Sequence, residues 1–109
     1  MKILVLGTHP EERGGIAKFN TALIPVLEKF ARVQTAKGFN PILHKADWII
    51  ISNHENFDRL IRLPLRPPVL LVNHGRALKQ EYPNTHTIAA KPKAKAIKQI
   101  AQILKEEKN

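Results

Sequence analysis

Three short runs of branched apolar residues constrain the fold of this chain more than any other feature. They occupy residues 2–7, 47–52 and 69–73, and each ends in, or is followed by, glycine, asparagine or histidine. A strand with one face in water alternates apolar and polar residues, whereas a strand covered on both faces reads as a continuous apolar run. The runs therefore predict buried strands of a mostly parallel sheet, with Ile50 and Leu71 in the core.

Amphipathic segments alternate with these runs and carry the i, i+3, i+4 spacing of helices. Pro25 is expected to kink or divide the first of them, and Pro92 suits the first turn of the last. The order predicts one domain over residues 1–109, a three-layer, Rossmann-like α/β fold whose sheet has about five strands and helices on both faces. The remaining predicted elements are helices at 14–31 and 55–63, strands at 32–36 and 85–89, and helical turns within 38–45 and 76–81.

Composition excludes several classes of protein. The 109 residues include no cysteine, so disulfides and cysteine-ligated zinc or iron–sulfur centres are ruled out. No apolar run approaches the roughly 20 residues of a membrane span, and the N-terminal run is too short for a signal-peptide core. We expect a cytoplasmic protein without a membrane span. Single methionine and tryptophan residues and eight prolines suit a thermophilic source.

Positive charge is concentrated in the second half of the chain. The net charge is +9, and residues 59–109 carry eleven basic and three acidic side chains. Such asymmetry indicates an anionic partner, which includes nucleic acids, sugar nucleotides and acidic lipid surfaces. A solvated surface on a stable protein is the alternative, and composition leaves both open.

Three histidines stand where predicted strands end. His9, His54 and His74 each come just after an apolar run. Ligands of open parallel sheets bind beyond the carboxyl ends of the strands, so the coincidence predicts a ligand site at that edge. Histidine is also an ordinary turn residue, which explains each position singly.

The pair Gly14-Gly15 opens the first predicted helix. Glycine there lets backbone N–H groups approach a phosphate at a helix N-terminus, and a helix start that needs positive φ is the alternative. The pattern is neither G-x-G-x-x-G nor a P-loop. Beyond the third run, His74 and Arg76 flank a glycine and are candidates for holding an anionic or hydroxyl-rich ligand, with a simple turn as the alternative.

Two other groups of residues invite functional interpretations. Helical spacing places His54 and Asp58 on one face, but two ligands are too few for zinc, and we expect neither a metal nor a cofactor. Lysines surround the start of the last helix and are suited to nucleic-acid phosphates, although aromatic residues for base stacking are missing there. A solvated helix face is the alternative for these lysines, which are Lys91, Lys93, Lys95 and Lys98.

Three landmarks in order resemble the N-terminal domain of GT-B fold glycosyltransferases, in particular the family 4-like group. The first is Gly14-Gly15-Ile16-Ala17 between a strand and an amphipathic helix. The second is the segment 46–54, where alanine-aspartate precedes an apolar run and a histidine. The third is the segment 68–75, which ends in histidine-glycine. Together the landmarks cover residues 1 to about 90.

The resemblance implies a domain that binds a sugar nucleotide or another phosphorylated small molecule. It assigns Gly14 and Gly15 to backbone contact with the ligand and His74 to the transferred sugar. Because it covers one of two Rossmann-like domains, it implies a minimised relative, one subunit of a split transferase, or a reused binding domain. A split transferase would be completed by a second such subunit or by a homo-oligomer. We add His54 and Arg76 as candidate ligand contacts and assign no catalytic residue. A basic nucleic-acid-binding protein without catalytic activity is the alternative.

Overall fold

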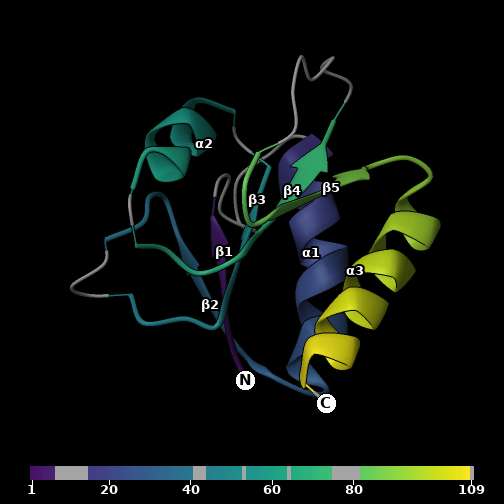
Figure 1. Cartoon of the computed structure of the whole chain (residues 1–109). Coiled ribbons are helices and arrows are strands. Elements are labelled where there is room, and N and C mark those ends of the chain that lie inside the picture. The colour runs from purple at the N-terminus through teal and green to yellow at the C-terminus, as the bar shows by residue number, and fades with distance from the viewer. Residues whose placement is uncertain (7–14, 41–43, 53, 64, 75–81, 109) are drawn as a thin grey trace.

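The computed structural model describes residues 1–6, 15–40, 44–52, 54–63, 65–74 and 82–108, with the side chains of residues 54–56 and 107–108 left out. Five parallel strands form one sheet in the order β2-β1-β3-β4-β5 (Figure 1). The prediction of a mostly parallel Rossmann-like sheet is confirmed. The strands are β1 (Lys2–Leu6), β2 (Arg32–Ala36), β3 (Trp48–Ile51), β4 (Val69–Asn73) and β5 (Thr85–Ala89), and the helices are α1 (Gly15–Glu28), α2 (His54–Ile61) and α3 (Lys93–Lys108).

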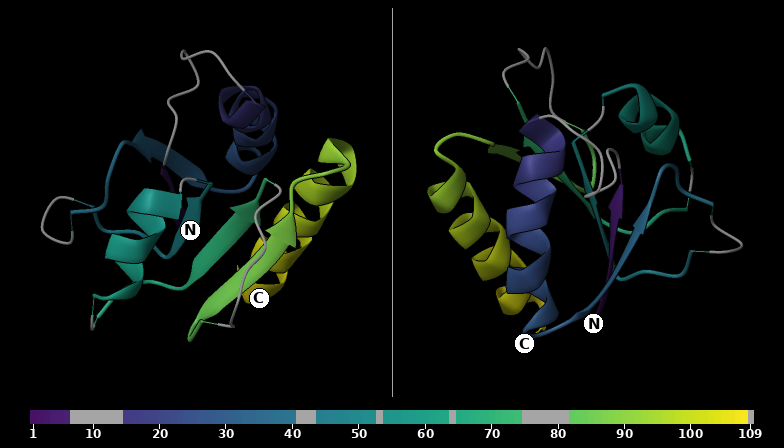
Figure 2. Two further views of the ribbon diagram at one scale, coloured as in Figure 1. Left: turned by 90° about the horizontal axis from the view of Figure 1, so that it is seen from above. Right: turned by 180° about the vertical axis from the view of Figure 1, so that it is seen from behind.

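Helices cover both faces of the sheet, as predicted. α1 and α3 lie side by side on one face and α2 lies on the other (Figure 2). Successive residues of a strand point to opposite faces, so Val5 and Ile50 pack beneath α1 and α3 while Leu6 and Ile51 pack beneath α2. A strand that is buried twice must be apolar at every position, which explains the three continuous runs.

The strand order explains why α1 and α2 lie on opposite faces. From β1 to β2 the chain moves toward one edge of the sheet, and from β3 to β4 it moves toward the other. Because crossovers between parallel strands are almost always right-handed, a reversal of direction moves the crossover helix to the other face. The reversal lies between β1 and β3, and ligand sites of doubly wound sheets form at such a point.

Two sequence expectations differ from the structure. The helix predicted over residues 14–31 ends at Glu28, and it continues through Pro25 without being divided into two helices. Proline has no N–H to donate to the backbone carbonyl one helical turn earlier. Because Pro25 is exposed, that carbonyl faces water rather than the core. The predicted turn at 76–81 lies outside the described residues, as does the centre of the turn at 38–45, where the His44 N–H donates to the Asn40 carbonyl at 2.7 Å.

Candidate functional site

The carboxyl ends of the strands form one edge of the sheet, and α1, α2 and α3 all begin on that side. It is the upper side in Figure 1, where α1 and α3 start. The first turn of α1 contains no acidic residue, and neither does that of α3. The partial positive charge of these two helix N-termini is therefore not offset from within the helices.

His74 lies directly after β4 and packs against α1. Its imidazole meets the ring of Phe19 edge-to-face, with centroids 5.4 Å apart and planes at 83°. Phe19 is buried on the inner side of α1, and Nε2 of His74 is buried as well. The strand-end histidine thus contacts α1 at Phe19, which follows Gly15, the first residue of α1, by about one helical turn.

Gly15 leaves open space at the start of α1. A Cβ built on this residue would meet no atom within 4 Å, and its φ lies outside the left-handed region. The interpretation that the backbone requires glycine for a positive φ therefore does not hold at Gly15. Gly14, the other member of the pair, lies outside the described residues.

A backbone hydrogen bond brings the start of the α3 segment to the same place. The N–H of Ala90 donates to the carbonyl of Asn73 at 2.9 Å, immediately before His74. Lys91 follows Ala90 and is exposed, as are the other lysines predicted to surround the start of α3. Lys91 therefore follows directly on a residue bound to the end of β4, and Lys93 begins α3 on the same side of the sheet (Figure 1).

Two buried polar residues were not predicted from the sequence. Ser52 follows β3 and is 2% exposed, and its Oγ has no hydrogen-bond partner in the described part of the chain. Asn20 is 1% exposed and lies beside Phe19 in α1. The available signals were a hydroxyl at the end of an apolar run and an amide on the apolar face of a helix, and both put hydrogen-bonding capacity near the carboxyl edge.

The described structure does not show where the side chains of the other predicted ligand residues lie. His54 begins α2, but its side chain is not described, and Arg76 and His9 lie outside the described residues. Of the residues singled out from sequence, the structure therefore places Gly15, His74, Lys91 and Lys93 on the carboxyl side of the sheet, and the printed contact among the site elements is that of His74 with Phe19 of α1. No group of three metal-ligating side chains occurs among the residues that the structure describes.

His86 and Arg66 lie away from this edge. His86 packs its ring 5.6 Å from that of Trp48. Arg66 donates to the Pro83 carbonyl at 2.6 Å and to the Asn84 carbonyl at 3.3 Å, and burial lowers the pKa of its guanidinium. These contacts join the segment before β4 to the turn before β5, at the amino edge.

Comparisons with known proteins add no family to this geometry, because no family model, no curated protein and no solved structure matches the chain. The resemblance to GT-B glycosyltransferases therefore stays a prediction. None of the three described helices has both the length and the apolar character needed to cross a membrane.

Proposed function

We propose that this chain binds a phosphate-bearing small molecule, of the sugar-nucleotide class, at the carboxyl edge of its sheet. The observation that carries the proposal is the packing of His74 against Phe19, which holds a strand-end imidazole beside the first turns of α1. Open space at Gly15 leaves the N-terminus of that helix accessible. Backbone N–H groups and a positive helix end are suited to phosphate, and imidazole is suited to a sugar hydroxyl or a phosphate oxygen.

The proposal gives each residue a separate role. Backbone N–H groups at Gly14 and Gly15 contact the diphosphate, His74 hydrogen-bonds the sugar or a phosphate, and Arg76 neutralises charge. His54, at the start of α2, borders the same edge. Lys91 and Lys93 raise the positive potential around the ligand and favour its association.

Glycosyl transfer would require more than this domain. On the proposed reading the chain is the N-terminal-like half of a GT-B transferase, and the sugar nucleotide lies between it and a second Rossmann-like subunit or a second copy. We assign it binding and orientation of the ligand, and no catalytic residue.

Calorimetric titration with a panel of nucleoside diphosphates and sugar nucleotides tests the proposal. We expect binding that falls about tenfold or more in His74→Ala, the amount that one or two lost hydrogen bonds remove. His86→Ala is the matched control, because His86 is exposed and lies at β5 beside Trp48. Absence of binding by the whole panel, or equal losses in both variants, would refute the site.

Nucleic-acid binding is the second candidate, and one observation favours it. Lys91, Lys93, Lys95 and Lys98 are all exposed around the start of α3 and give it a basic surface. Such a surface attracts phosphates without reading sequence. Salt dependence separates this candidate from a sugar-nucleotide site.

A further inference from the structure

The outer edge of β2 presents backbone groups that the sheet does not use. β2 is the last strand on its side and pairs only with β1. The Arg32 N–H donates to the Met1 carbonyl at 2.9 Å, so alternation along the ladder turns the N–H and C=O groups of Val33 and Thr35 away from β1. Neither residue hydrogen-bonds to any described residue through these outward groups.

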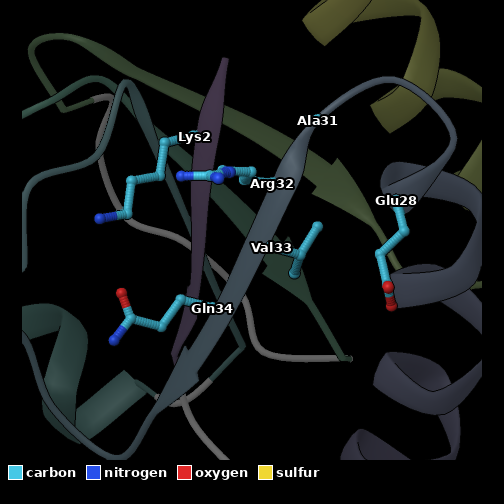
Figure 3. Close-up of a pocket in the computed structure, with 6 residues that line it drawn as sticks. All are labelled: Lys2, Glu28, Ala31, Arg32, Val33 and Gln34. Atoms are coloured by element: carbon cyan, nitrogen blue, oxygen red, sulfur yellow. The ribbon is translucent and has the colours of Figure 1, made fainter.

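A hollow of about 460 Å³ lies along this edge. Figure 3 shows Lys2, Arg32 and Gln34 directed to one side of β2, while Val33 and Glu28 lie on the other side. The division follows from strand alternation, since Val33 packs toward the core beneath α1 whereas Arg32 and Gln34 point the opposite way. The hollow therefore has a basic wall and an acidic wall with a free strand edge between them.

Arg32 and Gln34 on the basic wall are exposed, and a described carboxylate beside this wall is Asp47, whose Oδ2 accepts from the Lys2 backbone N–H at 2.7 Å. Described residues 37–40 and 44–47, between β2 and β3, contain no helix, so none covers Arg32 and Gln34. Lys2 and Arg32 are register partners on adjacent strands, and neither side chain forms an ion pair with a described residue. Two adjacent cations beside the one carboxylate of Asp47, with which neither forms an ion pair, keep a positive local potential that favours an anionic partner.

We propose that the β2 edge is a docking site for an extended acidic segment of a partner protein, which adds to the sheet as a further strand. Its backbone pairs with the outward groups of Val33 and Thr35. Its acidic side chains alternate, so that they face Lys2 and Arg32 on the basic wall, and the residue between them faces Val33 and Glu28. Main-chain bonds give such a complex affinity, and the alternating side chains give it specificity.

Charge selects this occupant over a second copy of the chain. Each copy carries a net charge of +9. Edge-to-edge pairing of two copies would bring two sets of Lys2 and Arg32 toward one another, and charged residues on an edge strand are a common defence against self-pairing. The same charges attract an acidic strand.

NMR titration of the whole chain tests the proposal with two capped peptides. In the first, glutamate alternates with valine; in the second, proline replaces valine, which keeps the charges but removes alternate N–H donors and disfavours strand pairing. We expect the first peptide to shift the amide signals of Val33 and Thr35 and to bind at least about tenfold more tightly than the second.

Three variants locate the binding. Thr35→Pro removes an outward N–H and leaves the ladder to β1 intact, so we expect a melting curve close to that of the parent chain and binding weakened about tenfold. Arg32→Glu should also weaken binding about tenfold, and it keeps the proposal testable if the proline variant fails to fold. Lys98→Glu makes the same charge change on an exposed position of α3 and should leave binding within about twofold.

Several results would overturn the proposal. They are no binding of the alternating peptide, equal affinity for both peptides, equal losses in Arg32→Glu and Lys98→Glu, or shifts confined to α3. Concentration-dependent shifts of Val33 and Thr35 without peptide would also overturn it, because they would identify a second copy as the occupant. None of these results bears on the carboxyl-edge site, whose ligand and residues are different.

Discussion

Lys2 and Asp47 are joined by a reciprocal pair of hydrogen bonds. The Lys2 N–H donates to Oδ2 of Asp47 at 2.7 Å, and the Asp47 N–H donates to the Lys2 carbonyl at 2.8 Å. The pair ties the first residue of β1 to the residue before β3. We expect Asp47→Ala to lower the free energy of unfolding by about 0.5–1.5 kcal/mol, measured by urea denaturation. Asp47→Asn keeps an oxygen acceptor and should lose less; equal losses would show that this hydrogen bond contributes nothing.

Ile50 of β3 and Leu71 of β4 are fully buried, and they pack on opposite faces of the sheet. Truncating either to alanine should therefore cost about 2–5 kcal/mol of unfolding free energy, from lost burial and the cavity left behind. Leu65 is 89% exposed, and Leu65→Ala should change stability by no more than about 0.5 kcal/mol. A loss below 1 kcal/mol at Ile50 or Leu71 would contradict the sheet order, which places both strands inside the sheet.

Arg66 joins the segment before β4 to the turn before β5 by hydrogen bonds. Its guanidinium donates to the carbonyls of Pro67, Pro83 and Asn84. Lysine cannot reproduce this forked geometry, so we expect Arg66→Lys and Arg66→Ala both to destabilise, by about 1–3 kcal/mol. Hydrogen exchange should become faster in β5 than in β1 in both variants. Uniform acceleration across the sheet would instead indicate a global effect.

Substitution of Gly15 tests ligand binding separately from folding. Because a Cβ at this position meets open space and the backbone φ is outside the left-handed region, Gly15→Ala should leave the melting temperature within a few degrees of the parent chain. The added methyl group stands in front of the helix N-terminus, so sugar-nucleotide affinity should fall about tenfold. A collapsed melting curve without ligand would mean that the glycine serves the fold.

The salt dependence of the binding affinity distinguishes a DNA duplex from a sugar nucleotide as the ligand. DNA binding that neutralises several phosphates should weaken steeply with salt, with a log–log slope of about −0.9 per phosphate contacted. We expect weak DNA binding at low salt that is largely lost near physiological ionic strength, where the Debye length is about 8 Å. His74→Ala should keep this DNA binding and lose sugar-nucleotide affinity. Submicromolar DNA affinity at physiological salt, abolished by replacing Lys91, Lys93, Lys95 and Lys98 with glutamine, would favour the nucleic-acid candidate.

The strands were the most predictable part of the fold. The bounds expected at residues 32–36, 69–73 and 85–89 match β2, β4 and β5. The helices were less predictable at their ends, since α1 ends at Glu28 and continues through Pro25. Helix termination depends on what the last turn packs against, and the exposure of Pro25 is a property of the folded chain.

The candidate site was predictable only as a location. The positions of His74 after a strand and of Gly14-Gly15 at the start of a helix could be predicted, because local apolar spacing indicates where strands and helices lie. The contact of His74 with α1 is not visible in the sequence, since His74 and Phe19 are 55 positions apart and meet through the packing of α1 on the sheet. Ser52 and Asn20 were missed because a polar residue beside an apolar stretch reads the same whether it is buried or exposed.

The sequence by itself determined which segments are strands and which faces are buried, because a strand covered twice must be apolar throughout and that pattern is local. Only the tertiary structure decided the order β2-β1-β3-β4-β5, the placing of α1 and α2 on opposite faces, and the contacts of Lys2 with Asp47 and of Phe19 with His74. These depend on crossover handedness and on which apolar surfaces pack together, and both act between segments far apart in the chain.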